Sequence, residues 1–263
     1  MLLTIDVGNT QTVVGLYEHP RANGVDAADG LVDHWRLATN ADRTADELAV
    51  TFQGLLGFHE ISWDDDITGI AMSSGVPRLS ASLRRMTERF GFSPVVIEPG
   101  VKTGIAIQYD NPKEVGADRI ANAVAAYDLY GGPTIMVDFG TATTCDAVSE
   151  DAEYLGGAIA PGIEISMDAL YGRAAALRQV ELVEPRNVLG KSTVESIQSG
   201  AVYGFAAQVD GIVSRIEDEL GESTVVATGG LAELIAPFTE RVQHVEPWLT
   251  LHGLRIVFEK NRP

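Results

Sequence analysis

The sequence has only one cysteine and few basic residues. Cys145 is the sole cysteine in 263 residues, so a disulfide within the chain is excluded. It lies in an apolar run, which favours a buried, unreactive thiol over a catalytic one. A chain without disulfides is typical of a reducing compartment, and we expect a cytoplasmic protein.

The shortage of basic residues restricts what the protein can bind. Nineteen Lys and Arg face 37 Asp and Glu, which gives a net charge of −18. A chain this acidic is unsuited to general electrostatic binding of nucleic acid, and we expect no such partner. The same charge repels small anions. A phosphate site would therefore need a metal ion, backbone N–H groups aimed at the ligand, or a locally placed cation.

Long apolar runs and histidine clusters are also missing. No stretch approaches the ~20 apolar residues of a membrane span, so we expect no membrane association. The N-terminal run Leu2–Ile5 is broken by Asp6 and lacks a basic region before it, which is not the pattern of a signal peptide. The five histidines show no spacing typical of metal ligands.

Hydrophobic periodicity predicts a mixed α/β fold. Strands are expected at 2–6, 12–17, 34–39, 67–73 and 94–98, with a surface loop at 19–33. Thr44 and Glu47 form a predicted capping box, followed by an apolar helix face at Leu48, Phe52, Leu55 and Leu56. A second helix is expected at 77–90. The first part of the chain therefore has the order βββαβαβ.

The pattern then restarts. After an irregular segment at 100–114, we expect a helix at about 117–130, a strand–turn–strand unit at 134–148 and a helix at 163–178. Ser192 and Glu195 form another predicted capping box, which begins a long helix ending near 220. A strand at 223–230 ends in two glycines. Residues 248–260 fit either a strand or a helix.

A short motif occurs in both halves. Asp6-Val7-Gly8-Asn9-Thr10 and Asp138-Phe139-Gly140-Thr141-Ala142 each place an acid and a glycine at the end of an apolar strand. Their separation, 138 − 6 = 132, is about half the chain. This repeat predicts two related domains, which we place at 1–112 and 113–263, around a shared cleft.

The repeated motif favours phosphate binding. Each glycine is followed by a strand rather than a helix, so neither loop is a Walker P-loop. A tight hairpin can still bind an anion, because glycine lets the backbone approach it and consecutive N–H groups converge on it. A carboxylate at the strand end can hold a cation. One such motif alone is typical of a solvated hairpin, but two copies half a chain apart indicate a pair of loops that grip a nucleotide.

Two further segments allow more than one interpretation. Asp118 and Arg119 begin a predicted helix just after Gly116. They are either a first-turn acid favoured by the helix dipole beside a solvated arginine, or a base beside a cation that recognises a carboxylate or phosphate. Gly229 and Gly230 form either an ordinary strand-to-helix turn or an edge that accommodates a flat nucleoside.

These segments together resemble a known family. The stretches IDVGNTQTVVGLY, NPKEVGADRIANAVAAY, VDFGTATTCDAV, GGAIAPGI, GKSTVESIQSGAVYGF and VVATGGLA are similar, in this order, to those of type III pantothenate kinases. That family belongs to the superfamily of acetate kinases, sugar kinases, 70-kDa heat-shock chaperones and actin. The resemblance implies two ribonuclease-H-like domains, each βββαβαβ, and a homodimer. It also implies that ATP phosphorylates pantothenate in the first step of coenzyme A synthesis.

The resemblance also assigns roles to residues. It implies that Asp118 is the catalytic base, that Asp6 orients Mg²⁺ through water, and that Asp138 holds a monovalent cation, K⁺ or NH₄⁺. The implied ATP contacts are Asp6, Val7, Gly8, Asn9, Thr10, Gln11, Thr12, Val13, Thr141, Gly229 and Gly230. The implied pantothenate contacts are Tyr109, Gly116, Ala117, Asp118, Arg119 and Thr193.

Two alternatives remain at this level. Another kinase of the superfamily, such as a sugar kinase, would need several polar groups for hydroxyls, whereas Tyr109, Arg119 and Thr193 suit a small amide with a carboxylate. A non-catalytic accessory protein that binds nucleotide would be expected to have a damaged loop or to lack the base, and neither is seen in the sequence.

Overall fold

The computed structural model describes residues 1–18, 27–174 and 177–262. The chain divides into two compact units. The first comprises residues 1–129 and the C-terminal segment 248–263, and the second comprises 130–247. Each unit contains its own sheet and its own hydrophobic core. Within the described residues, no helix is both long and apolar enough to cross a membrane.

The first unit is built on a sheet with the strand order β3-β2-β1-β4-β5. Its strands are β1 (Leu2–Val7), β2 (Gln11–Tyr17), β3 (Leu31–Ala38), β4 (Gly69–Ser74) and β5 (Val95–Val96). β1, β2 and β3 pair antiparallel, whereas β4 runs parallel to both β1 and β5. Its helices are α1 (Ala45–Gly57), α2 (Pro77–Arg89), α3 (Ala117–Tyr130, up to Leu129 in this unit) and α7 (Leu249–Lys260). A short strand, β6 (Ala106–Ile107), and a 3₁₀ turn, η1 (Pro112–Glu114), precede α3.

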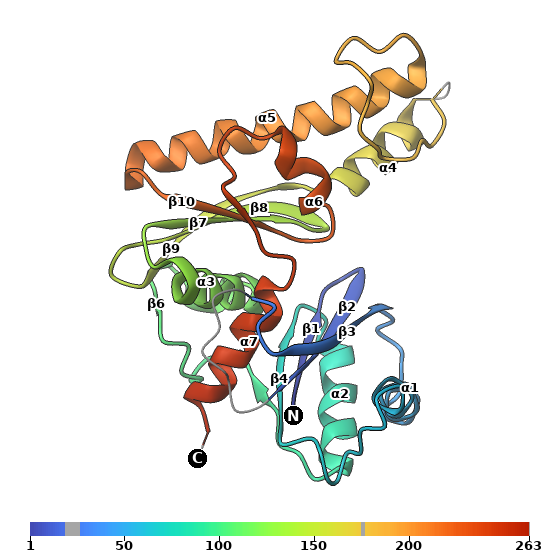
Figure 1. The fold of residues 1–263 in the computed structure, drawn as a ribbon, viewed down its shortest axis with the longest axis vertical. Coiled ribbons are helices and arrows are strands. Elements are labelled where there is room, and N and C mark those ends of the chain that lie inside the picture. The colour runs from blue at the N-terminus through green and yellow to red at the C-terminus, as the bar shows by residue number, and fades with distance from the viewer. Residues whose placement is uncertain (19–26, 175–176, 263) are drawn as a thin grey trace. The chain divides into compact units, whose positions relative to one another are not determined.

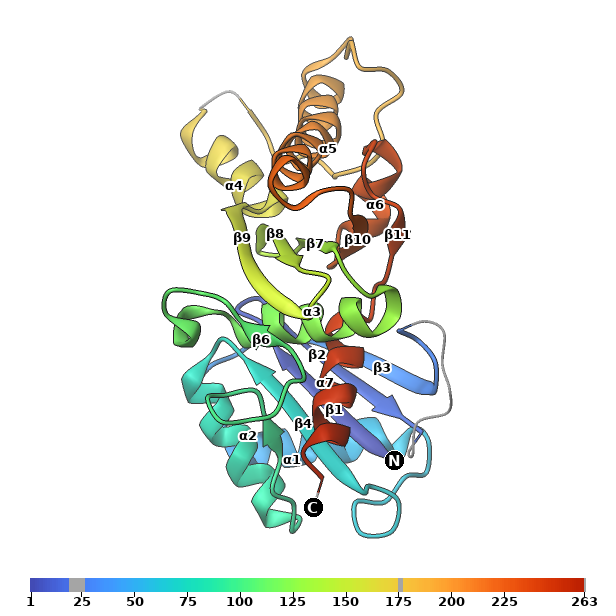
Figure 2. The ribbon, with the colours of Figure 1, turned by 90° about the vertical axis from the view of Figure 1, so that its left-hand side faces the viewer.

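The alternation of side chains along β1 decides what each face of this sheet contacts. Leu3, Ile5 and Val7 are buried in the core that includes the apolar sides of α1 and α2. The opposite face, which carries Thr4 and Asp6, is covered by α7, which packs on β1 and β4 (Figures 1 and 2). Asp6 therefore ends β1 on the face opposite α1 and α2.

Helix α7 also contacts α3. The Thr250 hydroxyl donates to Asn122 Oδ1 at 2.7 Å, and His252 Nε2 lies 3.2 Å from Asp128 Oδ2. His252 is fully buried, as is the guanidinium-bearing Arg255 one turn further on. These bonds fix α3 against an element that itself packs on β1, so the start of α3 has a defined position relative to the β1 hairpin.

The second unit repeats this plan. Within residues 130–247 the strand order of its sheet is β11-β10-β7-β8-β9, with β7 (Thr134–Phe139), β8 (Ala142–Val148), β9 (Glu153–Pro161), β10 (Thr224–Thr228) and β11 (His244–Val245). β7, β8 and β9 are antiparallel, and β10 is parallel to β7 and β11. Its helices are α4 (Ile163–Arg173), α5 (Thr193–Leu220) and α6 (Ala232–Ile235), followed by η2 (Ala236–Phe238). Ile135, Val137 and Phe139 face the core shared with α5.

The two units confirm the predicted repeat. Strands β1 to β5 correspond in order and direction to β7 to β11. The first unit reads βββαβαβ, and the second has the same order except that two helices, α4 and α5, lie between β9 and β10. Asp6 lies opposite Ser73 of β4, and Asp138 lies opposite Thr228 of β10, at equivalent register positions. The α/β fold with two ribonuclease-H-like halves is therefore as the sequence predicts.

Several details differ from the sequence expectations. α4 ends at Arg173 rather than near 178, since Ala174 already has an extended backbone (φ −104°, ψ 100°), and α7 shows that 248–260 is mostly helical. Ser192 caps α5 through the N–H of Glu195, but the Glu195 carboxylate accepts from Lys191 N, so only half of the second capping box forms. The first box, at Thr44, is complete.

Two other expectations have a different outcome. Of the expected surface loop at 19–33, residues 19–26 lie outside the described part of the chain, and the last three belong to β3. The predicted domain boundary between 112 and 113 stays a prediction. The division into compact units is a different one, because it keeps most of α3 with the first unit and returns α7 to it.

Candidate active site

The β1–β2 hairpin presents the first candidate loop. Asp6 is half-buried at the end of β1, and Gly8, Asn9 and Thr10 form the turn before β2. The buried Ser73 hydroxyl donates to Asp6 Oδ1 at 2.6 Å. A short hydrogen bond from a hydroxyl to a carboxylate fixes the orientation of that carboxylate, and such a bond is stronger than one between two neutral groups when the carboxylate is charged. Ser73 was not predicted from the sequence. The signal that could have found it is the pair Ser73-Ser74 at the end of an apolar strand.

A second residue that sequence reasoning missed braces this loop. Thr39, just after β3, donates its hydroxyl to the Gly8 carbonyl at 2.8 Å and lies 2.9 Å from the Thr12 hydroxyl. Its backbone N–H also donates to the Thr10 carbonyl at 2.9 Å. These bonds to the Gly8 and Thr10 carbonyls restrain the backbone of the loop, while the Asn9 and Thr10 residues remain exposed.

The remaining residues predicted for this loop lie where the sequence places them. Val7 is buried in β1, Gln11 is exposed at the start of β2, Thr12 is buried and Val13 is half-buried. The Gln11 side chain accepts from Arg36 at 3.3 Å.

The β7–β8 hairpin presents the equivalent loop in the second unit. Asp138 is half-buried at the end of β7, and Gly140 and Thr141 form the exposed turn. Gly229, at the end of β10, has a φ of +95°, and a Cβ there would lie 2.5 Å from Asp138 Oδ1. Glycine is required here both by backbone conformation and by space. The structure thus brings together Asp138 and Gly229, two predicted residues that are 91 apart in sequence (229 − 138).

The start of α3 forms the third group. Asp118 is exposed, and its Oδ1 accepts from the backbone N–H of Arg119 at 2.8 Å. A Cβ added to Gly116 would collide with Asp118 Oδ1. The same Cβ would lie 3.6 Å from Arg119 Cδ. Gly116 therefore leaves room for the carboxylate to fold back over the helix start. Arg119 is 8% exposed, so a cation is held within the same turn as the acid.

The other predicted residues are placed singly. Tyr109 is half-buried before η1, and Ala117 begins α3. Thr193 is exposed as the first residue of α5, and Gly230 is exposed after β10. The assignment of these residues to ATP or pantothenate stays a prediction.

Cys145 has no place in this chemistry. It lies within β8 and is 1% exposed. Burial, assisted by the neighbouring Asp146 carboxylate, raises the pKa of the thiol to about 12. The thiolate that a nucleophile needs is therefore absent near neutral pH, as the apolar run around it predicts.

The donor set for metal ions is sparse. Across residues 1–18, 27–174 and 177–262, no cluster of three or more His, Cys, Asp or Glu side chains could enclose an ion. Single carboxylates such as Asp6 suit Mg²⁺ that keeps several waters and binds mainly to substrate phosphates.

The chain matches known proteins over nearly all of its length. The family described as type III pantothenate kinase matches residues 2–215. The chain belongs to the type III pantothenate kinase family. Proteins named type III pantothenate kinase are 56% identical in Streptomyces griseus and 55% identical in Thermobifida fusca. These alignments cover 99% of this chain, with 98% and 100% of the respective relatives. The family predicted from the motifs is thus confirmed.

Solved structures add the fold. Component A of (R)-2-hydroxyglutaryl-CoA dehydratase from Acidaminococcus fermentans superposes with a TM-score of 0.58 at 13% identity, over 99% of both chains. The inorganic polyphosphate/ATP-glucomannokinase from Arthrobacter sp. strain KM gives 0.53 at 14% identity, over 98% of both chains. At such identities the likeness concerns the architecture alone, which agrees with the two-unit fold of this family member.

Proposed function

We propose that this enzyme transfers the γ-phosphate of ATP to pantothenate, giving ADP and 4′-phosphopantothenate, the first step of coenzyme A biosynthesis. The observation that carries the proposal is the start of α3. There an exposed acid, Asp118, and a buried cation, Arg119, share one turn in a chain that belongs to the pantothenate kinase family. We place the reaction in the cytoplasm, where ATP is available.

The β1–β2 and β7–β8 hairpins, which carry the repeated acid and glycine, bind the nucleotide in this proposal. The exposed Asn9 and Thr10 in the first unit, and Thr141 in the second, offer donors to phosphate oxygens. Thr39 keeps the first loop preformed, which removes part of the ordering cost of binding. Gly229 and Gly230 offer a backbone edge to the nucleoside. Phosphoryl transfer relies on such positioning and charge neutralisation rather than on covalent chemistry by the protein.

Asp118 acts as the general base in this proposal. Its carboxylate accepts the proton of the pantothenate hydroxyl as the oxygen attacks phosphorus. The N–H of Arg119 engages Oδ1, and no described group donates to the other oxygen, so it is available to the hydroxyl. Arg119 supplies the charge that a substrate carboxylate needs, and Tyr109, Gly116, Ala117 and Thr193 complete the proposed pantothenate contacts.

Cations neutralise the phosphate charge. Mg²⁺ bound to ATP would be oriented through water by Asp6, whose Oδ1 already accepts from Ser73. A monovalent cation, K⁺ or NH₄⁺, would be held by Asp138. The backbone around Phe139 and Gly229 is close enough to that carboxylate to share such a site.

The proposal includes a homodimer. A groove of about 620 Å³ runs between α4 and α5 and is lined by Met167, Leu170, Ile197 and Phe205, with Thr193 at its rim. The same unit exposes Val188 (65%) and Leu189 (76%). Apolar surface on this scale, next to a residue assigned to substrate, supports a second copy as the partner.

A coupled kinase assay tests the proposal. Purified protein with ATP, Mg²⁺, K⁺ and pantothenate should release ADP and form 4′-phosphopantothenate, identified by mass spectrometry. Absence of turnover with every monovalent cation tried would refute it. Nucleotide binding without turnover would instead point to the accessory role, which the intact acid at position 118 and both intact loops disfavour. A panel of sugars tests the other kinase alternative.

A further inference from the structure

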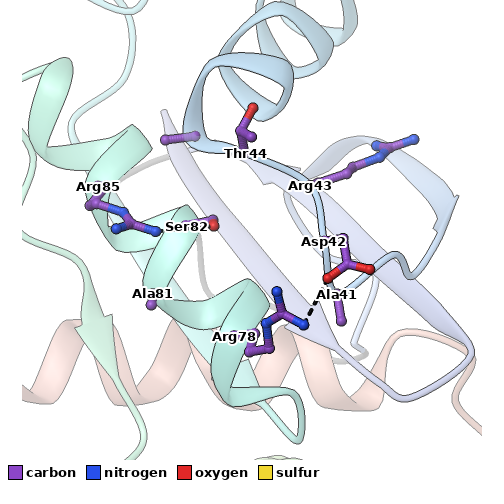
Figure 3. Close-up of a pocket in the computed structure, with 9 residues that line it drawn as sticks. Ala41, Asp42, Arg43, Thr44, Arg78, Ala81, Ser82 and Arg85 are labelled. Atoms are coloured by element: carbon purple, nitrogen blue, oxygen red, sulfur yellow. Dashed lines mark hydrogen bonds and ion pairs between the residues drawn. The ribbon is translucent and has the colours of Figure 1, made fainter.

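A hollow between the start of α1 and the side of α2 is not used by the proposed reaction. It has a volume of about 400 Å³ and is formed by residues 41–45 and by Arg78, Ala81, Ser82 and Arg85 of α2 (Figure 3). Its size falls within the range of small-molecule sites, which is about 300–1,000 Å³. All of its lining residues belong to the first unit.

The hollow is basic in an otherwise acidic protein. Its lining contains Arg43, Arg78 and Arg85 but only one acid, Asp42, which leaves 3 − 1 = 2 positive charges. Asp42 pairs with Arg78 at 2.8 Å, and both side chains are largely exposed. A pair this exposed contributes little, so an incoming anion can replace Asp42 at little cost.

The arginines of α2 differ in whether they pair with an acid, and this difference distinguishes those in the hollow from those outside it. Arg84 pairs with Glu98, and Arg89 pairs with Asp46, both outside the hollow. Arg85 instead has its guanidinium 3.5 Å from the Ser82 hydroxyl and forms no ion pair with a carboxylate of the described residues, whereas the charge of Arg43 acts on the Glu47 carboxylate. In a protein with nearly twice as many acids as bases, an arginine left without an acid beside a cavity is available to an external anion.

The polar groups around the hollow suit phosphate. Arg78 and Arg85 lie two helical turns apart on the same side of α2, and in Figure 3 both guanidinium groups point toward the space bounded by residues 41–45. Ser82, between them, is 6% exposed and places its hydroxyl in the lining. Planar guanidinium groups bind phosphate oxygens two at a time, whereas a single hydroxyl adds one donor.

We propose that this hollow, the α1–α2 arginine pocket, binds a small compound that carries two or more phosphate charges. Arg78 and Arg85 grip the phosphate oxygens, the Ser82 hydroxyl donates to one of them, and Asp42 turns away into solvent. The Arg43 side chain extends away from α2 in Figure 3, so Arg43 adds positive charge near the pocket without a direct contact to the ligand.

A ligand in the pocket would also affect the nucleotide loop, which is the turn at residues 8–10 between β1 and β2. The lining begins at Ala41, two residues after Thr39, which bonds to the Gly8 and Thr10 carbonyls. A ligand that fixes residues 41–45 therefore fixes the chain that braces the loop. This consequence rests on the proposed role of that loop in ATP binding, whereas the binding itself does not.

Calorimetric titration of the full-length protein with pyrophosphate, in metal-free buffer, tests the proposal. The titration is repeated with the variant Asn9→Ala/Thr10→Ala, which removes the exposed side-chain donors of the β1–β2 loop. We expect a binding event that persists in this loop variant and is at least ~10-fold weaker in the double variant Arg78→Gln/Arg85→Gln. The matched variant Arg84→Gln/Arg89→Gln removes the same charge from the same helix outside the pocket and should retain the event.

Three results would overturn the proposal. These are no event beyond the nucleotide loop, equal weakening in both double variants, and citrate binding as tightly as pyrophosphate, which would remove the assignment to phosphate. Pantothenate kinase activity is measured in parallel. Both double variants should keep their basal activity, since none of these arginines belongs to the proposed catalytic machinery. Pyrophosphate binding without kinase activity in the wild-type protein would refute the proposed function and leave the pocket standing.

Discussion

Replacing Ser73 by alanine removes the hydrogen bond that holds Asp6. The Ser73 hydroxyl is fully buried and lies 2.6 Å from Asp6 Oδ1. A hydrogen bond to a charged group contributes ~1.5–3 kcal/mol. If Asp6 orients the metal of ATP, as we propose, the loss of this bond lets the carboxylate rotate away from the productive position.

The expected effect follows from that magnitude. With each 1.36 kcal/mol worth a factor of ten, kcat/KM for ATP should fall roughly 10- to 100-fold, and the Mg²⁺ concentration for half-maximal rate should rise. The fold should persist, because losing this bond costs ~1.5–3 kcal/mol and each kcal/mol shifts the Tm of a chain of this size by about 2–4 °C. Steady-state kinetics with Mg²⁺ titration, together with a melting curve, measures both effects.

Two matched variants make the test specific. Ser73→Thr keeps the hydroxyl and should recover most of the activity, because Thr228 occupies the equivalent position opposite Asp138 in the second unit. Thr4→Val removes another fully buried hydroxyl, bonded to the Gly15 carbonyl on the same sheet, and should leave the Mg²⁺ dependence unchanged. Normal Mg²⁺ dependence in Ser73→Ala, or the same loss in Thr4→Val, would refute the reasoning.

Three further changes test other parts of the structure. Asp118→Asn should lower kcat by roughly 100-fold or more, while the Kd for ATP measured by calorimetry stays unchanged; an active variant would exclude this residue as the base. Gly229→Ala should lower the Tm clearly more than Gly221→Ala, because both positions have φ +95° but only the first would press a Cβ against a carboxylate; equal losses would show that conformation alone matters. A hydrogen bond from His59 lowers the pKa of Asp33 below its usual 3.8, so this contribution to stability is complete above that value and disappears as the pH falls through the lowered pKa. Asp33→Asn should therefore lower the urea midpoint near pH 6 and have no effect in strong acid, and a difference that does not change with pH would contradict this.

Local sequence patterns predicted most elements because their physical causes are local. The capping box at Thr44 is complete, and the apolar positions Leu48, Phe52 and Leu56 are the buried side of α1. The motif of an acid followed by a glycine turn occurs twice because Asp6 and Asp138 hold equivalent positions near the end of a central strand, and that repeat predicts two related units.

Where the structure of a segment depends on which contacts its side chains make, the sequence predicted it only in part. Residues 248–260 fit both a strand and a helix, since their periodicity does not distinguish the two and buried positions, including the polar His252 and Arg255, occur on nearly every side of the helix. The helix is selected by its burial against the sheet and α3. The cap at Ser192 forms only in part, because the Glu195 carboxylate finds the Lys191 N–H instead.

The sequence by itself therefore determined the family, the two hairpins and the acid at the start of α3, since each is written in consecutive residues. Only the tertiary structure decided which distant residues support them. Ser73 reaches Asp6 because β4 lies parallel to β1, and Gly229 approaches Asp138 because β10 lies beside β7. The arginine pocket exists because α1 and α2 pack side by side. These pairings depend on strand register and helix packing, which link residues far apart in the chain, so local periodicity does not specify them.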